Sequence, residues 1–447
     1  MSQKYHFPEG LYADVRIEEK CYTQLVRFNG ELVTDRMLTE SGAFIRVFDG
    51  KLWYTTSTNE LDEIQKELDS LAELATPNPE IAEHPAIKLL EVNTDERIQY
   101  EDVKLENIAR DRFLSVLSQY EAVVSAESAP EINARVANVG GEYMKKSFYS
   151  SKGSAIVYDY QMCMASTWIT YVVDGQPTQG GKNFFAVTPE GLTGHEDELR
   201  AEFARYLDFA KNATPIEPGE YTCVLSPITT AMFAHESFGH KSEADFMLND
   251  KVLRDEWVMG KKVGSDLVTI IDSGDLPNHG YIPYDDEGTK ARETKLITNG
   301  VLTGRLHDSN SAAALSEELT GNCRAQDYGC SPVVRMTNTY MAPGPDSFED
   351  IIADTKDGIY VYMVDNGTGS STFVMNASVC YRIRDGKICE PVRVRMLTGS
   401  VFQTLFDIDK VGTDFTLFDT YTCGKFGQSV RVSAGGPSIR VRRLSVS

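Results

Sequence analysis

Two histidines and a glutamate, His235, Glu236 and His240, lie within six residues of one another. Neutral imidazole nitrogens bind zinc, and a neighbouring carboxylate can take a proton from a zinc-bound water molecule. The chain contains only seven histidines, so two of them in one such group is an unusual arrangement. The residue types predict a catalytic metal site, and the alternative interpretation is two unrelated histidines on a helix.

The spacing of the two histidines is one residue longer than in the common zinc-peptidase motif. That motif is His-Glu-x-x-His on one face of an α-helix, whereas the pattern here is His-Glu-x-x-x-His. In a regular α-helix, residues five apart are separated by about 140° around the axis, against about 40° for residues four apart. Two geometries would let both imidazoles reach one metal ion: a one-residue bulge, or a helix end at which Gly239 lets the chain turn.

A catalytic zinc ion needs a third protein ligand and an open position for water. No other histidine stands in a comparable group, and Cys423 is a candidate. Gly424 and Gly427 predict a backbone that can approach other groups closely, and Lys425 favours the thiolate over the thiol. Judged on its own surroundings, Cys423 is more typical of a buried apolar filler.

The metal motif follows a helix with a clear start. Ser226 is suited to the N-cap position and Pro227 to the first helical position. The helix runs through the apolar residues Ile228, Ala231 and Met232 into His235, which places the metal motif on its second half. Farther along, the pair Gly367 and Gly369 lacks the strand-turn-helix frame of a phosphate loop, and a turn is the favoured interpretation.

A segment with two prolines and a glycine, residues 212–219, is the best domain boundary. We expect an N-terminal domain over 1–215 and a C-terminal domain over 216–447. The first combines amphipathic helices with antiparallel strands, joined by tight turns such as Asn29-Gly30. The second is β-rich and carries the metal-motif helix, so the predicted fold class is α+β.

Composition excludes several classes of protein. The net charge of −22 argues against binding nucleic acid or an anionic membrane through bulk electrostatics. No apolar run approaches the length of a membrane span, and the first residues lack the apolar core of a signal peptide. The eight cysteines include no Cys-x-x-Cys pair. We therefore expect a cytoplasmic protein that contacts neither nucleic acid nor membrane directly.

The block His-Glu-Ser-Phe-Gly-His-x-x-Glu-Ala-Asp, which starts at His235, resembles the metal motif of the TldD/PmbA metallopeptidases, in the TldD branch that keeps its metal. Residues 13–19 resemble the N-terminal start of that family. Four further blocks agree in the same order: residues 284–288, 299–302, 335–340 and 423–428. Lys241 departs from the pattern, because a small residue is expected there, and the segment after Gln428 is more basic than expected.

The resemblance implies a Zn²⁺-dependent peptidase with His235, His240 and Cys423 as metal ligands and Glu236 as the general base. It also implies a homodimer, or a heterodimer with a metal-free family member. The family is linked to processing of peptide-antibiotic precursors, to antitoxin degradation and to modulation of DNA gyrase. Because no motif for particular side chains is present, we expect the substrate to be an unfolded peptide, bound mainly through its backbone at a strand edge of the C-terminal domain.

A second functional hypothesis is a non-catalytic, metal-stabilised binding protein that modulates a partner such as DNA gyrase or a toxin-antitoxin component. Glu236 argues against it, since a structural zinc ion has no use for a free carboxylate and would prefer a fourth protein ligand.

Five other acidic residues remain open in role. Two could hold the imidazoles or lie on a solvated helix face, Glu243 and Asp245. Three could contact substrate or form a plain acidic turn, Asp285, Asp286 and Glu287.

Overall fold

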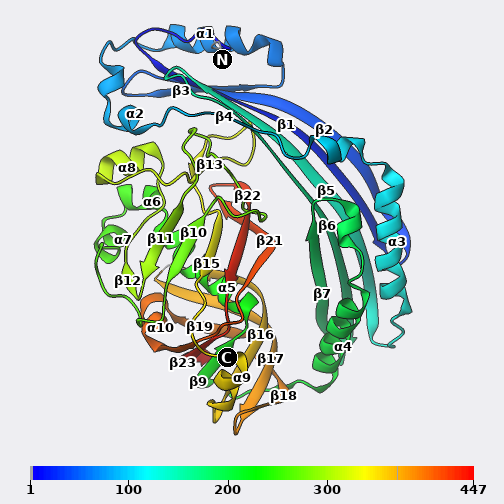
Figure 1. The fold of residues 1–447 in the computed structure, drawn as a ribbon. Helices are drawn as coiled ribbons and strands as arrows, with labels where there is room; N and C mark the ends of the chain where they lie inside the picture. The colour runs from blue at the N-terminus through cyan, green and yellow to red at the C-terminus, as the bar shows by residue number, and fades with distance from the viewer. Residues whose placement is uncertain (1–3, 370) are drawn as a thin grey trace. The chain divides into compact units, whose positions relative to one another are not determined.

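The computed structural model describes residues 4–369 and 371–447, which fold into two compact units (Figure 1). Unit 1 consists of Met1–Ala82, Val92–Asn212 and Asp327–Ser331, and unit 2 of Glu83–Glu91, Ala213–Gln326 and Pro332–Ser447. The structure contains 26% helix and 45% strand, which confirms the α+β class.

Unit 1 is built on one seven-stranded sheet with strand order β3-β2-β1-β5-β6-β4, to which β7 is added beside β6. Its strands are β1 (Tyr12–Phe28), β2 (Glu31–Phe48), β3 (Trp53–Thr58), β4 (Thr94–Arg97), β5 (Ile132–Ser150), β6 (Ala155–Val173) and β7 (Gln176–Ala186). The long strands pair antiparallel, and Asn29-Gly30 forms the predicted tight turn between β1 and β2, with φ values of 48° and 88°.

Three helices cover this sheet: α1 (Ile64–Leu74), α3 (Arg110–Ala126) and α4 (Glu196–Asn212). Apolar residues at helical spacing give each helix one buried face, as in α1 with Ile64, Leu68 and Leu71. Helix α1 packs against β2, α3 against β5, and α4 against β7 (Figure 1).

Unit 2 contains an eight-stranded sheet, ordered β16-β9-β23-β19-β17-β18-β8 with β20 beside β23, and a six-stranded sheet, ordered β12-β11-β10-β15-β22-β21. A short pair, β13 with β14, completes its strands. The bounds are β8 (Thr214–Pro215), β9 (Gly219–Leu225), β10 (Ile270–Ser273), β11 (Glu293–Thr298), β12 (Val301–Leu302), β13 (Cys323–Arg324), β14 (Val333–Val334), β15 (Asn338–Met341), β16 (Asp357–Gly369), β17 (Thr372–Arg384), β18 (Lys387–Arg393), β19 (Met396–Ser400), β20 (Ile408–Val411), β21 (Thr416–Lys425), β22 (Gln428–Gly436) and β23 (Ile439–Val446).

Helix α5 (Pro227–Ala234) lies between the two sheets of unit 2, because it packs against β16 of one sheet and against β15 and β22 of the other (Figure 1). Ser226 caps it as predicted by accepting a hydrogen bond from the Thr229 backbone N–H, with Pro227 in the first turn. The remaining helices of unit 2 are α2 (Pro85–Leu89), α6 (Ala244–Asn249), α7 (Lys251–Glu256), α8 (Ser309–Leu315), α9 (Phe348–Ala353) and α10 (Val401–Asp407).

Within residues 4–369 and 371–447, none of the helices combines the length and the apolar character that crossing a bilayer requires.

Candidate metal centre

The two histidines of the motif are brought to one side of the chain by a π-helical turn. Helix α5 runs directly into η6 (His235–Gly239), a π-helix, which is followed by the 3₁₀ turn η7 (His240–Ser242). The backbone N–H of His240 donates to the carbonyl of His235, five residues earlier. The two imidazole centroids are 5.2 Å apart. A bulge therefore absorbs the extra residue in the motif, and the chain remains helical through His240.

Gly239 serves packing rather than a turn. Its φ of −54° is that of a right-handed helix, which any residue can adopt. A Cβ atom at this position would lie far inside van der Waals distance of the Met336 sulfur, and Met336 is fully buried. The alternative in which Gly239 ends the helix is wrong, because its backbone is helical. A glycine is needed here because only a hydrogen atom leaves room for the Met336 side chain.

Cys423 reaches the histidines from β21, where it pairs with Val430 of β22. Its Sγ lies 3.4 Å from Nε2 of His240, and the ligand atoms of His235, His240 and Cys423 all lie within 4.8 Å of one another. Ligands at about 2.0–2.3 Å from a tetrahedral zinc ion are themselves about 3.5 Å apart. The donor set and its compactness fit Zn²⁺.

The Cys423 thiol and the His240 imidazole shift each other's pKa. Burial alone would raise the pKa of Cys423. Hydrogen bonds with His235 and His240 act in the opposite direction and, with the charges of these rings, bring the pKa to about 5. Burial lowers the pKa of His240, while the hydrogen bonds with Cys423 and Glu243 raise it to about 10. Cys423 is therefore a thiolate at neutral pH, the form that binds metal. A metal ion bound here would replace the proton of the hydrogen bond between Cys423 Sγ and His240 Nε2.

Glu236 lies inside the π-helical turn, next to His235. Burial raises its pKa, with the neighbouring histidines acting in the opposite direction and Cys423 adding to the rise. The end of β16 packs directly against this residue: a Cβ at Gly367 would lie 3.1 Å from Glu236 Cγ, and one at Gly369 would lie 2.6 Å from the Glu236 carbonyl oxygen. The turn predicted for Gly367 and Gly369 is wrong, since both belong to a strand that contacts the site.

The role of glycine near Cys423 also differs from the prediction. Among the described residues, no heavy atom lies within 4 Å of a Cβ built at Gly424. Gly427 has a φ of 76° and forms the hairpin turn with Phe426. Near the site, close approach of backbone occurs instead at Gly239, Gly367 and Gly369, and no sequence pattern marks these glycines for that purpose.

Glu243 and Asp245 face the interior rather than solvent. Glu243 is fully buried, and its Oε2 lies 3.3 Å from Nδ1 of His240, which directs Nε2 of that ring toward Cys423. Asp245 pairs with Lys425, both of its oxygens lying 2.8 Å from the lysine Nζ. Of the two alternatives for these residues, the solvated helix face is therefore excluded.

The acidic segment 285–287 is buried and holds neighbouring loops through hydrogen bonds. Asp285, Asp286 and Glu287 are all buried. The Asp285 carboxylate accepts hydrogen bonds from three backbone N–H groups, Asp286 accepts one from Ala325, and Glu287 accepts from the backbone and side chain of Ser309. Of the two alternatives, the acidic turn is the one that the structure bears out: residues 286 and 287 form a turn in which the Gly288 N–H donates to the Asp285 carbonyl at 3.1 Å, and this turn is buried.

Lys241, which departs from the family pattern, fits the structure as a large buried cation. Its Nζ lies 2.7 Å from Glu256 and 4.9 Å from the centre of the Phe402 ring.

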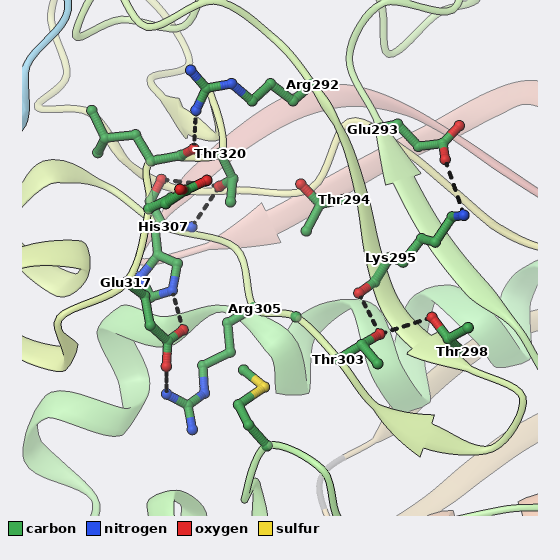
Figure 2. Close-up of a pocket in the computed structure, with 14 residues that line it drawn as sticks. Arg292, Glu293, Thr294, Lys295, Thr298, Thr303, Arg305, His307, Glu317 and Thr320 are labelled. Atoms are coloured by element: carbon green, nitrogen blue, oxygen red, sulfur yellow. Dashed lines mark hydrogen bonds and ion pairs between the residues drawn. The ribbon is translucent and has the colours of Figure 1, made fainter.

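A separate cavity of about 660 Å³ lies beside β11 and is lined by polar and charged side chains (Figure 2). His307 is buried there, with Nε2 2.8 Å from Glu317 and Nδ1 3.1 Å from Ser311. Glu317 also accepts from Arg305 at 2.6 Å. This histidine is held by a local polar network. Within the described residues, His235, His240 and Cys423 form the only group of three or more side chains placed to hold a metal ion.

A largely buried His-His-Cys group beside a glutamate fits a catalytic metal centre, which uses three protein ligands and an open position for water. Comparison with known proteins shows the family. The family model "PmbA/TldA metallopeptidase C-terminal domain" matches residues 218–447, and "PmbA/TldA metallopeptidase domain 1" matches residues 13–76. The chain belongs to the PmbA/TldD metallopeptidase family, which confirms the resemblance found in the sequence.

Two curated relatives and two solved structures illustrate the range of similarity. A metalloprotease of Methanocaldococcus jannaschii is 30% identical over 96% of both chains. A metalloprotease of Methanothermobacter thermautotrophicus is 38% identical over 67% of this chain and 66% of its own length. A crystal structure from Thermotoga maritima, described as that of "a putative modulator of a DNA gyrase", has a TM-score of 0.79 at 19% identity. It covers 98% of this chain and 96% of its own. TldE from Thermococcus kodakarensis has a TM-score of 0.76 at 15% identity and covers 98% and 96%. These structures share the fold.

Proposed function

We propose that this protein is a zinc-dependent peptidase that hydrolyses peptide bonds in unfolded peptides. The observation that carries the proposal is the convergence of three donor atoms, from His235, His240 and Cys423, within 4.8 Å of one another. A relative from Saccharolobus solfataricus that is 37% identical over 54% of both chains is named a zinc metalloprotease TldD homolog. Three protein ligands leave one tetrahedral position open for water, as in catalytic zinc sites.

The residues of the chain would divide the reaction between them. When bound, a zinc ion would act as a Lewis acid toward the attacking water and the peptide carbonyl. Glu236 takes the proton of that water and later delivers it to the leaving amine. Burial favours this role, because it raises the carboxyl pKa toward the working pH. Glu243 holds the ring of His240 through Nδ1 and keeps Nε2 directed at the centre.

The competing function is a metal-stabilised binding protein that cuts nothing. A purely structural zinc ion is usually enclosed by four protein ligands. Among the described residues the group contains three candidates, with a carboxylate on the neighbouring residue Glu236. This composition favours catalysis over a structural role.

The decisive experiment compares wild type with Glu236→Gln, because this substitution preserves shape and removes the base. The substrate is one protein offered in two forms, folded and as a denatured, alkylated chain, with fragments followed by mass spectrometry. We expect about one zinc per chain in both enzymes and a loss of about 10²- to 10⁴-fold in cleavage by the variant. The denatured form should be cut and the folded form spared, because folding opposes access by about 5–15 kcal/mol. Undiminished cleavage by zinc-loaded Glu236→Gln would make this residue a spectator.

A further inference from the structure

Lys425 is a buried cation beside the metal centre that the proposed reaction does not use. Its side chain is only 2% exposed, and its Nζ lies 2.8 Å from both oxygens of Asp245, 2.8 Å from the Val334 carbonyl and 3.1 Å from Glu243. The ammonium also lies 4.1 Å from the centre of the Phe246 ring. A charge removed from water to this degree is stable only with such partners.

Two contacts join the same pair of segments at this point. Lys425 follows Cys423 by two residues on β21, so both side chains project from the same face of the strand. Glu243 follows His240 by three residues. Two contacts therefore join β21 to the segment that follows the π-helical turn. The first is between Cys423 and His240, and the second is the ion pair between Lys425 and Glu243.

The carboxylate of Glu243 couples the lysine to the imidazole. A single oxygen, Oε2, lies 3.3 Å from Nδ1 of His240 and 3.1 Å from Nζ of Lys425. The Lys425 ammonium is the counter-charge that Glu243 and Asp245 share. Without it, two carboxylates would face each other in a buried site. Their repulsion would turn Glu243 away from the ring and free His240 to rotate.

We propose that Lys425 is a positioning residue of the metal centre. It fixes the hairpin of β21 and β22, which carries Cys423, against the segment after His240, and it holds Glu243 in the orientation that aligns the imidazole. The inference rests on the proposed metal site and adds to it a residue that touches neither metal nor substrate.

The test measures metal binding by Lys425→Met, which keeps most of the side-chain stem and removes the charge. Zinc affinity is obtained by competition with a chromogenic chelator, and the ligand geometry from the absorption spectrum of the Co²⁺-substituted protein. Outer partners of metal ligands typically contribute 10- to 100-fold in affinity. We expect a loss in that range and a cobalt spectrum with altered intensity, since His240 is no longer held.

Lys241→Met is the matched control, because Lys241 is also a buried lysine paired with a carboxylate, Glu256, and lies next to His240 in sequence. Its zinc affinity should fall much less than that of Lys425→Met, because the Lys241 ammonium contacts Glu256 and Phe402, whereas the Lys425 ammonium contacts Glu243. An equal loss in both variants would mean general destabilisation and would overturn the proposal, as would wild-type affinity and spectrum in Lys425→Met.

Glu243→Gln provides an independent arm should Lys425→Met fail to fold, because it weakens the same coupling with no change in size. It should show the same spectral change and a similar loss of affinity, and a wild-type spectrum in this variant contradicts the inference. Neither readout depends on cleavage. A wild-type protein that binds zinc yet cuts no peptide would defeat the proposed function and leave the role of Lys425 intact.

Discussion

At the scale of single residues, two glycines of β16 define how close the backbone comes to the proposed base. Gly367 and Gly369 present only hydrogen atoms toward Glu236, so the strand can lie directly against the π-helical turn. A side chain at either position would push the strand or the turn aside. Since a displacement of about 1 Å in a catalytic group can lower the rate about 100-fold, these positions should affect turnover.

We predict that Gly369→Ala lowers peptide cleavage by about 10- to 100-fold and leaves zinc content unchanged. The added Cβ would meet the Glu236 carbonyl oxygen at 2.6 Å, whereas the metal ligands lie on other residues. Gly424→Ala is the control, because the described residues leave open space around a Cβ there. Steady-state kinetics with metal analysis decides the matter: equal activity in the two variants would exclude the proposed contact.

A second residue-scale prediction concerns the charge of Cys423 in the metal-free protein. Burial raises its pKa, but the hydrogen bonds and charges of His235 and His240 together outweigh burial and bring the pKa to about 5. The thiolate should therefore persist as the pH falls through neutrality and disappear only near pH 5. Burial raises the pKa of Cys163 and Cys223 to about 12, which keeps these thiols protonated over that range. Ultraviolet absorbance of thiolate should show the step in wild type and lack it in Cys423→Ser. A wild-type titration without a step below pH 7 contradicts the assignment.

At the scale of elements, the π-helical turn is the device that makes this histidine spacing workable. It inserts the extra residue at the point where α5 meets the core around Met336. The turn thus depends on a long-range contact as well as on its own sequence, and removing the space for Met336 should disturb it.

We predict that Gly239→Ala destabilises the metal-free protein by about 1–3 kcal/mol, the usual cost of overpacking a core. Met336→Ala alone creates a cavity and should also destabilise. In the double variant the new methyl group occupies part of that cavity. Its loss of unfolding free energy should therefore be smaller than the sum of the losses in the two single variants. Denaturant unfolding of the four proteins measures this, and strict additivity would show that the two side chains do not compete for space.

The elements that the sequence predicted correctly are those with local signals. Ser226-Pro227 marks a helix start, and Asn29-Gly30 marks a hairpin, because capping and positive φ depend on neighbours along the chain. The spacing of His235 and His240 restricts the backbone between them to a bulge or a turn. The structure has the bulge, and the packing of Met336 against Gly239 is a long-range contact that the spacing does not predict.

Other features of the site depend on residues distant in sequence. Cys423 lies 183 residues from His240, and the pairing of Lys425 with Asp245 spans 180. No periodicity reports such contacts, so Cys423 was identified by chemical complementarity and family resemblance. The burial of the acidic turn 285–287 could not be predicted for the same reason, since its hydrogen-bond donors include Cys323 and Ala325.

At the scale of the whole molecule, unit 1 exposes a strand edge suited to association. β3 pairs with β2 only over Ala43–Phe48, while β2 begins at Glu31. The uncovered part of β2 carries four exposed apolar side chains: Leu32, Val33, Met37 and Leu38. An uncovered edge with exposed apolar residues is a typical site of strand pairing between chains.

We therefore predict a dimer at micromolar concentration that uses this edge. Val33 and Leu38 are 58% and 55% exposed, and the double variant Val33→Lys/Leu38→Lys should shift the protein to monomer because lysines oppose edge pairing. Leu52→Lys, at a position 61% exposed outside this edge, should leave the dimer intact. Light scattering that finds monomer in wild type, or dimer in all three proteins, would contradict the prediction.

The distance along the chain between the histidines and Cys423 has a consequence for biosynthesis. A ribosome adds about 5–20 residues per second, so the 183 residues between His240 and Cys423 take roughly 10–40 s to make. Throughout that interval the nascent chain contains the two histidines and Glu236 but lacks Cys423, whose thiolate completes the donor set. The order of synthesis therefore delays assembly of the centre until the β21–β22 hairpin has emerged. Under the proposed function, the nascent chain would have no complete peptidase centre during that interval.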